Sequence, residues 1–290
     1  MAESPLALRA GLDATARLLH LFGEHRYLLA DVVANATFAL QPGRRRTTVR
    51  NYQAVFPTLS RRQTRRLAAR SFREYARTSL DFVYVHRLSR PRLMGLFHGF
   101  GDQPVRQMMA DGKGGILVLI HLGAWDAGGA WAAATGFPVT AVMADEGGGA
   151  IQDLVIWARS LLGIRVVVAS KSARLLLQTL HQGGWVALLA DIPGDTPALE
   201  VEFLGRRTLF SAAPTMLAAR TGVPLIPVVA VRSPGGGYLM EVHPPHFVER
   251  DADPSEALKP VLAVFEKAVR RWPEQWYPFG EGRLLDLSPG

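Results

Sequence analysis

Cysteine is missing from the 290-residue sequence, so the chain forms no disulfide bond and offers no thiolate to a metal. It also lacks the uninterrupted run of about 18 apolar residues that a membrane-spanning helix needs. The segment from Met1 to Ala10 has neither the basic start nor the continuous apolar core of a secretory signal. These absences predict a soluble or peripheral protein without a disulfide framework.

The patterns of several common enzyme classes are missing as well. No serine stands in Gly-x-Ser-x-Gly, and His-Glu-x-x-His does not occur. No pair of histidines has convincing spacing for a metal site, and Gly112-Lys113 lacks the remaining residues of a P-loop. The sequence therefore argues against a serine hydrolase, a metalloenzyme, a kinase and a dehydrogenase, and it predicts neither a metal nor a cofactor.

Lysine is scarce, because only four of the 33 basic residues are lysine and the rest are arginine. The formal net charge is +8, and the arginines cluster in the first third of the chain, at Arg44, Arg45, Arg46, Arg50, Arg61, Arg62, Arg65 and Arg66. Arginine makes forked contacts to phosphate that lysine cannot copy. Such a cluster attracts nucleic acid, an anionic membrane surface or a phosphorylated cofactor. No zinc finger, RNP-type aromatic pattern or basic heptad accompanies it, so we expect no nucleic-acid partner and favour a membrane surface.

The segment from Pro5 to Phe22 mixes leucines with Arg9, Arg17 and His20 in a helical pattern. A helix of this kind either lies in a membrane interface or packs on the body of the protein. The pattern alone leaves both alternatives open.

Helical patterns come first in the chain, over residues 5–38 with an interruption near Gly23 and over 60–86 with Ser60 as N-cap. Pro42-Gly43 marks a turn between them. Candidate strands follow at 116–120, 139–143, 166–169, 186–190, 225–231 and 238–242, most of them separated by helical stretches at 150–162, 173–182 and 212–221. This alternation predicts an α/β fold with a largely parallel central sheet, covered by helices on both faces, and a helical N-terminal layer. We expect a single domain over 1–290, with the helical layer at 1–90 and the α/β core at 91–290.

One apolar run has a candidate catalytic residue at its end. Residues 116–120 read as a strand buried on both faces, His121 follows directly, and Asp126 comes five positions later. The carboxyl ends of parallel strands are where open α/β sheets bind ligands. Histidine exchanges protons near neutral pH and is a common general base. The competing interpretation is a core histidine with a satisfied hydrogen bond.

The segment His121-Leu-Gly-Ala-Trp-Asp126 resembles the His-x4-Asp motif of the glycerolipid acyltransferases. The resemblance is greatest to the branch with the bacterial lipid A and mycobacterial phosphatidylinositol mannoside acyltransferases. Further elements of that branch occur in the same order over roughly residues 46–278: Arg50-Asn51 with Phe56-Pro57-x-Leu59-Ser60, Arg159-Ser-Leu-Leu-Gly163, Glu200-Val-Glu-Phe-Leu-Gly205 with Gly222-Val-Pro-Leu-Ile-Pro227, and Pro273-Glu-Gln-Trp276. His-x4-Asp alone is a weak pattern, but the ordered set is fairly specific.

The resemblance implies transfer of a fatty acyl group from a thioester to a hydroxyl, with His121 as general base. A carboxylate on the far ring nitrogen would orient the imidazole, and two candidates exist. Asp126 belongs to the motif, but five residues of helix turn it away from His121 unless His121 lies in the turn before the helix. Glu200 matches the relay glutamate of the family's third block. We favour Glu200 on His121, with Asp126 supporting the loop and sensing the leaving group or donor.

Further site residues are expected around this pair. The backbone N–H groups of Leu122, Gly123 and Ala124, at the start of the following helix, are candidates to stabilise the oxyanion. Arg159 matches the family's central arginine and would hold a phosphate or sugar hydroxyl, together with Asp145 or Glu146. Small and apolar residues at 212–219 are candidates to line an acyl tunnel or to form helix core.

The resulting hypothesis is an acyltransferase that works as a peripheral protein at the cytoplasmic face of the cell membrane. Its donor would be acyl-CoA, and its acceptor an anionic lipid or glycolipid. A lipid A type enzyme using acyl carrier protein is the alternative within the class, although that branch usually has glutamate where this chain has Asp126, and an N-terminal membrane anchor that is not evident here. A non-catalytic lipid-binding protein on the same fold is the alternative of another class.

Overall fold

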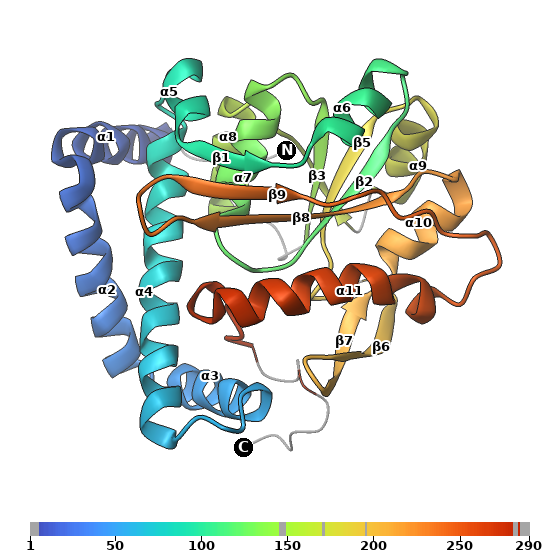
Figure 1. The fold of residues 1–290 in the computed structure, drawn as a ribbon. Helices are drawn as coiled ribbons and strands as arrows, with labels where there is room; N and C mark the ends of the chain where they lie inside the picture. The colour runs from blue at the N-terminus through green and yellow to red at the C-terminus, as the bar shows by residue number, and fades with distance from the viewer. Residues whose placement is uncertain (1–5, 145–148, 170–171, 195, 281–283, 285–290) are drawn as a thin grey trace.

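The computed structural model describes residues 6–144, 149–169, 172–194, 196–280 and Leu284. Its first part is a layer of helices along one side of the molecule (Figure 1), made of α1 (Leu6–Phe22), the 3-10 turn η1 (Gly23–His25), α2 (Arg26–Leu40), α3 (Pro42–Val55) and α4 (Arg61–Val85). The predicted cap of α4 is confirmed, because the Ser60 hydroxyl accepts from the Gln63 N–H, and Gln63 accepts in return from the Ser60 N–H. The basic segment after Pro42-Gly43 is itself a helix, with Pro42 in its first turn.

The central sheet contains seven strands in the order β1-β9-β8-β2-β5-β3-β4. All neighbours in it are parallel except β8 and β9. The strand bounds are β1 (Phe97–Phe100), β2 (Gly115–Leu119), β3 (Val139–Met143), β4 (Arg165–Val168), β5 (Trp185–Leu189), β8 (Leu225–Arg232) and β9 (Tyr238–Val242). Five of the six neighbour relations in this sheet are therefore parallel, as expected for an α/β fold with crossover helices.

Helices cover both faces of this sheet (Figure 1). Alternate residues of β8 divide between two cores: Leu225, Val229 and Val231 face the core under α9, α10 and α11, whereas Val228 and Ala230 face the core under α7. The covering helices are α5 (Arg90–Gly95), α6 (Gln103–Ala110), α7 (Trp125–Ala134), α8 (Ala150–Leu161), α9 (Ala173–His181), α10 (Ala213–Thr221) and α11 (Pro254–Arg271), followed by the 3-10 turn η3 (Pro273–Gln275). The predicted fold class is confirmed.

A separate antiparallel hairpin of β6 (Ala198–Phe203) and β7 (Arg206–Ser211) lies outside the central sheet. Its two-residue turn, Leu204-Gly205, has positive φ angles of 56° and 72°. Two left-handed residues are the geometry of a tight type I′ turn. Glu200 lies in β6 of this hairpin, and Arg206 begins β7.

The helical layer is joined to the sheet by a buried polar network. The Tyr27 hydroxyl of α2 donates to Asp81 of α4 at 2.8 Å, and Arg232 at the end of β8 donates to both. Arg26 lies over the Tyr27 ring and forms a further ion pair with Asp81. Three of these four residues come from helices and Arg232 comes from the central sheet, so the layer is held in place relative to the sheet.

In the helical layer, α1 and α2 expose apolar side chains on their outer surface. α1 packs on α4 through Ala16, Leu19 and the stacking of His20 on Tyr84, yet most of its other leucines are exposed, namely Leu6, Leu8, Leu18 and Leu21. α2 leaves a continuous apolar face uncovered, made of Leu28, Leu29, Val32, Val33 and Leu40. Both alternatives for the first helix therefore have a structural basis, since one side packs and the other faces out. Among the described helices, none has the length and hydropathy of a membrane span.

Candidate active site

His121 and Asp191 form a hydrogen-bonded pair at the carboxyl edge of the sheet. β2 and β5 are parallel neighbours with Leu119 opposite Leu189, so each strand delivers its second following residue to the same level. His121 Nδ1 lies 2.7 Å from Asp191 Oδ1, and the His121 backbone N–H also donates to this oxygen at 3.1 Å. The Asp191 side chain is 4% exposed and that of His121 is 26% exposed. The aspartate is therefore a buried support for a histidine that reaches solvent.

Sequence reasoning missed Asp191, although a signal was present. Residues 186–190 read as a second buried apolar strand, and Asp191 follows it as His121 follows residues 116–120. Two parallel strands that each end in a titratable residue bring those residues to one sheet edge. Which strands are neighbours is a property of the tertiary fold, and the pairing becomes visible only there.

Glu200 does not hold the position predicted for it. It lies on the exposed β6–β7 hairpin, where its carboxylate accepts from Arg207 Nε at 2.6 Å. Asp191 takes the place on His121 instead, so the prediction that Glu200 orients the imidazole is wrong. The error came from assigning the relay to a glutamate in the hairpin rather than to the acid at the end of β5.

Asp126 and Arg159 form a second pair beside the first. Asp126 lies in the first turn of α7, where a carboxylate is favoured by the helix dipole, and it accepts from Arg159 Nε of α8 at 2.8 Å. Both side chains are mostly buried, at 17% and 14% exposed. The motif acid thus contacts the central arginine and not the histidine. Asp145 and Glu146, which were expected beside Arg159, lie outside the described residues.

The loop between β2 and α7 is fixed by the chain's C-terminal part. The Gly123 N–H donates to Gln275 O at 2.8 Å, and the Tyr277 N–H donates to His121 O at 3.1 Å. The Gln275 side-chain amide bonds both backbone groups of Arg232. Gly123 has a φ of +70°, and a Cβ there would lie 2.2 Å from Ala230 O. The signature Pro273–Trp276 therefore positions the His121 loop, and Gly123 allows the loop to approach β8 closely.

The same contacts overturn the predicted oxyanion donors. The N–H groups of Leu122, Gly123 and Ala124 donate to the backbone oxygens of Ile120, Gln275 and Ala230, at 2.6, 2.8 and 2.7 Å. A donor that already has a short, buried backbone partner is not available to a reacting oxygen without breaking that bond. These three groups hold the loop in shape, and the oxyanion prediction for them is wrong in this conformation.

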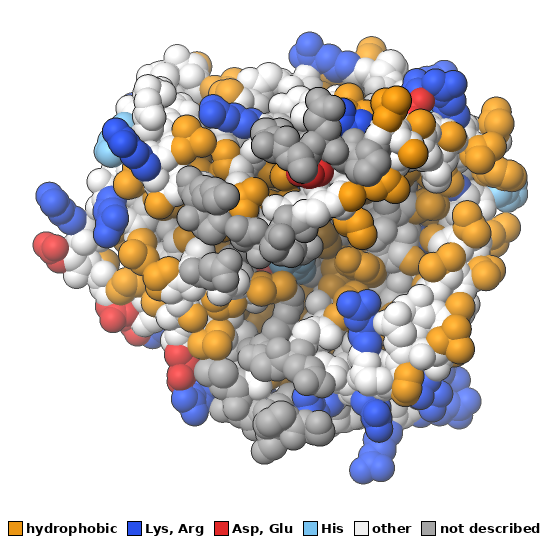
Figure 2. Space-filling model, turned by 180° about the vertical axis from the view of Figure 1, so that it is seen from behind, with side chains coloured by type: hydrophobic (Ala, Val, Ile, Leu, Met, Phe, Trp, Pro, Cys, Tyr) orange, Lys and Arg blue, Asp and Glu red, His pale blue; other side chains and the backbone are white. Residues whose placement is uncertain are grey.

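His121 and Asp126 line a cavity of about 670 Å³. Figure 2 shows the corresponding hollow on the rear face, rimmed by apolar side chains and with the pale blue of a histidine inside it. α4 contributes Tyr75, Thr78, Ser79 and Phe82 to the wall, and α10 contributes Ala213, Met216 and Leu217. The predicted contribution of residues 212–219 to the lining is thus seen for these three. The cavity combines a large apolar surface with polar side chains that include His121, Asp126 and Arg159.

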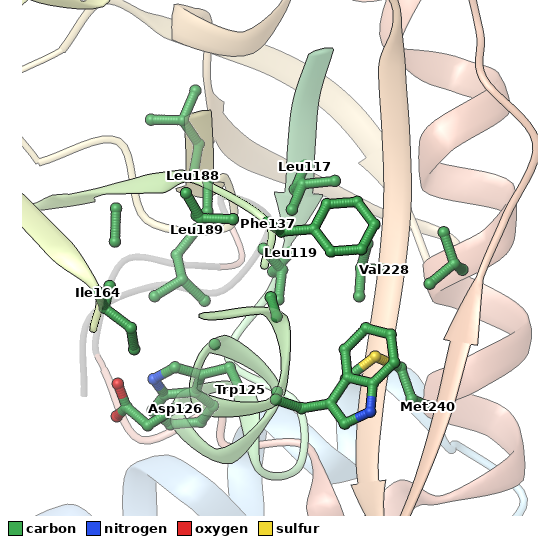
Figure 3. A pocket seen from close by; sticks show the side chains of 18 of the residues that line it. Leu117, Leu119, Trp125, Asp126, Phe137, Ile164, Leu188, Leu189, Val228 and Met240 are labelled. Atoms are coloured by element: carbon green, nitrogen blue, oxygen red, sulfur yellow. The ribbon is translucent and has the colours of Figure 1, made fainter. Parts of the chain in front are cut away.

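A smaller apolar cavity of about 90 Å³ lies between the sheet and α7 (Figure 3). The same residues separate the two spaces, because Trp125, Asp126, Arg159, Leu188 and Leu189 line both. Apart from Asp102, the remaining wall is apolar, with Leu117, Leu119, Phe137, Ile164, Val228 and Met240 among its residues. The smaller cavity therefore lies next to the His121 cavity, behind this shared wall.

The chain belongs to the bacterial lipid A biosynthesis acyltransferase family, whose model matches residues 14–280. It is 27% identical over 182 residues to a phosphatidylinositol mannoside acyltransferase of Mycolicibacterium smegmatis, covering 61% of this chain and 59% of that protein. The enzyme of the same name from Mycobacterium tuberculosis is 28% identical over 185 residues, covering 62% of this chain and 58% of that protein. The chain thus spans about three fifths of the length of these curated relatives.

Among solved structures, the 1-acyl-sn-glycerophosphate acyltransferase PlsC of Thermotoga maritima aligns with a TM-score of 0.41 and 15% identity. The alignment covers 87% of this chain and 98% of that one.

Proposed function

We propose that this protein transfers a fatty acyl group from a thioester donor to a hydroxyl group of a phospholipid or glycolipid. The observation that carries the proposal is that His121, bonded to buried Asp191, lines a large and mostly apolar cavity in a chain of this acyltransferase family. A buried carboxylate on one ring nitrogen and a cavity that takes apolar chains are the two requirements of such a reaction.

The chemistry follows from the geometry of the pair. The His121 Nδ1–H donates to Asp191, which leaves Nε2 as the acceptor nitrogen. Nε2 takes the proton of the acceptor hydroxyl while its oxygen bonds to the thioester carbonyl carbon. When the intermediate collapses the carbon–sulfur bond breaks, and the proton passes from the imidazolium to the leaving thiolate. Asp191 stabilises the imidazolium between these steps and keeps its ring oriented.

Arg159 and Asp126 serve to position the substrate in this proposal. Asp126 fixes the guanidinium through Nε, and the side chain lies on the wall of both cavities. The guanidinium has further N–H groups with which to hold a phosphate or sugar hydroxyl. Asp126 then acts through Arg159 and is a positioning residue.

The two cavities divide the acyl chain between them. The inner space of about 90 Å³ is smaller than the roughly 150 Å³ apolar cavity that holds one benzene ring. It therefore takes only the end of a chain, and the remaining methylenes lie in the 670 Å³ cavity. Each buried methylene contributes about 0.8 kcal/mol, so chain length is a strong determinant of donor binding.

The acceptor reaches the site from a membrane in this proposal. The apolar face of α2 carries exposed Leu28, Leu29, Val32 and Val33, and none of the exposed residues of α2 is charged. Basic residues of α3 and α4 flank it, which suits an anionic bilayer. We infer a peripheral protein on the cytoplasmic face of the cell membrane, with acyl-CoA as donor and acyl carrier protein as the alternative donor.

An acyl-transfer assay with His121→Ala tests the proposal. Palmitoyl-CoA and palmitoyl-acyl carrier protein are supplied separately with an anionic lipid extract, and acylated lipid is measured by mass spectrometry. We expect transfer from one donor and a loss of roughly 10²- to 10⁴-fold in the variant, because a general base is typically worth that much. Exposed His98→Ala is the matched control and should keep wild-type activity.

Two outcomes would contradict the proposal. An unchanged rate in a folded His121→Ala protein would remove the base from the mechanism. Tight binding of palmitoyl-CoA without transfer or hydrolysis by the wild type would favour a lipid-binding protein on the same fold.

A further inference from the structure

Six arginines surround a hollow of about 650 Å³ that is separate from the two cavities described above. α3 supplies Arg45, Arg46 and Arg50, α4 supplies Arg61 and Arg65, and β7 supplies Arg206. We call this hollow the arginine groove. Among the described residues, no carboxylate lines it.

Several of these charges have no counter-charge in the described part of the chain. Arg46, Arg61 and Arg65 form no ion pair there, whereas Arg77 and Arg159 are paired with carboxylates. Arg45 and Arg206 donate to the backbone oxygens of Phe38 and Ala54, each at 3.0 Å. These bonds fix the two side chains but leave their charge in place.

A concave surface lined by one sign of charge concentrates the electric field and raises the local concentration of the opposite ion. The planar guanidinium forks match the oxygens of phosphate, and such charge-assisted hydrogen bonds are about twice as strong as neutral ones. Three separate elements supply the forks, so a ligand with more than one phosphate oxygen contacts several at once. The chemistry of the groove is that of a phosphate site.

α4 connects the arginine groove with the His121 cavity. At 100° per residue, Arg61, Tyr75 and Ser79 lie within about 40° of one another around the helix axis, and Tyr75 and Ser79 line the His121 cavity. The distance along the axis from Arg61 to Tyr75 is about 20 Å. Figure 2 shows basic side chains below the hollow, on the side where α3 and the start of α4 lie.

We propose that the arginine groove binds the phosphate groups of a ligand on the same face of α4 as the His121 cavity. The ligand presents a phosphate or pyrophosphate to the groove. This group comes either from the nucleotide end of a coenzyme A donor or from the head group of an anionic lipid. That this ligand is a substrate of acyl transfer rests on the proposed function. The proposal that the groove is an anion site does not rest on the proposed function, because it is argued from the arginines alone.

Two double variants on one helix test the site. Arg61→Gln/Arg65→Gln removes two charges that line the groove. Arg62→Gln/Arg66→Gln is the control variant and removes two exposed charges of the same helix. These two residues lie about 100° and 140° around the helix axis from Arg61. Binding of pyrophosphate and of unacylated coenzyme A is measured by calorimetry, and binding of phosphatidylglycerol vesicles by sedimentation. Arg46→Gln is a third variant from α3, chosen because its side chain is also exposed.

We expect the groove variants to weaken at least one of these ligands by about tenfold or more, and the control variant to weaken it by much less. A loss confined to pyrophosphate and coenzyme A identifies the donor nucleotide as the source, and a loss confined to vesicles identifies a lipid head group. Equal losses in both double variants would reduce the groove to general surface charge and overturn the proposal, as would no loss in either. Because binding is measured without turnover, an inactive protein would contradict the proposed function and leave this test intact.

Discussion

The carboxylate that contacts His121 decides how the imidazole is oriented, and the structure assigns that contact to Asp191. Asp191→Asn keeps the shape of the side chain but removes its charge, so both the tautomer and the stabilisation of the imidazolium are affected. We expect transfer to fall by roughly 10²- to 10⁴-fold, chiefly in kcat. Glu200→Gln should leave the rate within about twofold, because its exposed pair with Arg207 is a surface ion pair.

A double variant separates a positioning role from an independent one. Asp191→Asn combined with His121→Ala should cost little more than His121→Ala alone, since the aspartate acts through the imidazole. Additive losses would show that Asp191 acts on the substrate by another route. If Glu200→Gln lowers the rate as much as Asp191→Asn does, Glu200 and not Asp191 would be the carboxylate that supports His121.

His86, after the end of α4, provides a pH-dependent test of stability. Burial lowers its pKa from the ordinary value of 6.5, and this effect outweighs a hydrogen bond with the Val83 backbone that acts in the opposite direction. Below about pH 6.5 the unfolded chain binds a proton that the folded protein resists, so stability falls as the pH is lowered. His86→Phe should reduce the loss of melting temperature between about pH 7.5 and pH 5.5. Exposed His98→Phe is the control, and parallel curves for wild type and His86→Phe would contradict this assignment.

At the scale of secondary structure, the loop between β2 and α7 depends on one glycine. Gly123→Ala places a Cβ 2.2 Å from Ala230 O in a backbone region that favours glycine. The loop must then move away from β8, which breaks the bonds that hold His121 beside Asp191. We expect a loss of melting temperature and a greater than tenfold loss of transfer. Gly112→Ala is the comparison, because that glycine also has a positive φ but has open space around its Cβ.

Gly112→Ala should lower stability by backbone strain alone and leave the rate per folded molecule unchanged. Equal loss of transfer in the two variants would mean that strain, and not the approach of the loop to β8, accounts for the effect.

The elements that the sequence predicted correctly are those with a clear period. The strands at 116–120 and 139–143 and the long helix after Ser60 were recognised, because an apolar run or a cap defines each of them. α11 was missed, since Pro260 interrupts an otherwise amphipathic helix. β1 and the β6–β7 hairpin were missed because each is short and partly exposed. Asp191 was missed because strand order depends on the tertiary fold.

On the scale of the whole molecule, the helical layer presents an apolar face that no described element covers. Leu28→Gln/Val32→Gln places polar groups on that face without touching the buried side of α2. We expect weaker binding to phosphatidylglycerol vesicles, with soluble-donor hydrolysis unchanged. Met94→Gln/Phe247→Gln changes two exposed apolar residues elsewhere and should bind vesicles as the wild type does.

The salt dependence of vesicle binding is a second test of the same surface. Exposed charges are screened within about 8 Å at physiological ionic strength, so the arginine contribution should weaken with added salt while the apolar contribution persists. If the α2 variant binds vesicles as well as the wild type does, and added salt does not weaken wild-type binding, this face is not the membrane contact.

The polar network between α2 and β8 also reaches the loop that carries His121. Tyr27 and Asp81 bond Arg232, the Gln275 amide bonds the backbone of Arg232, and Gln275 O accepts from Gly123 N–H. Coupling between two binding events is reciprocal in free energy. If a bilayer orders this loop so that the cavity binds its ligand more tightly, the filled cavity must strengthen binding to the bilayer by the same free energy. The loaded protein should leave the lipid surface more slowly than the empty one, and product release should precede desorption.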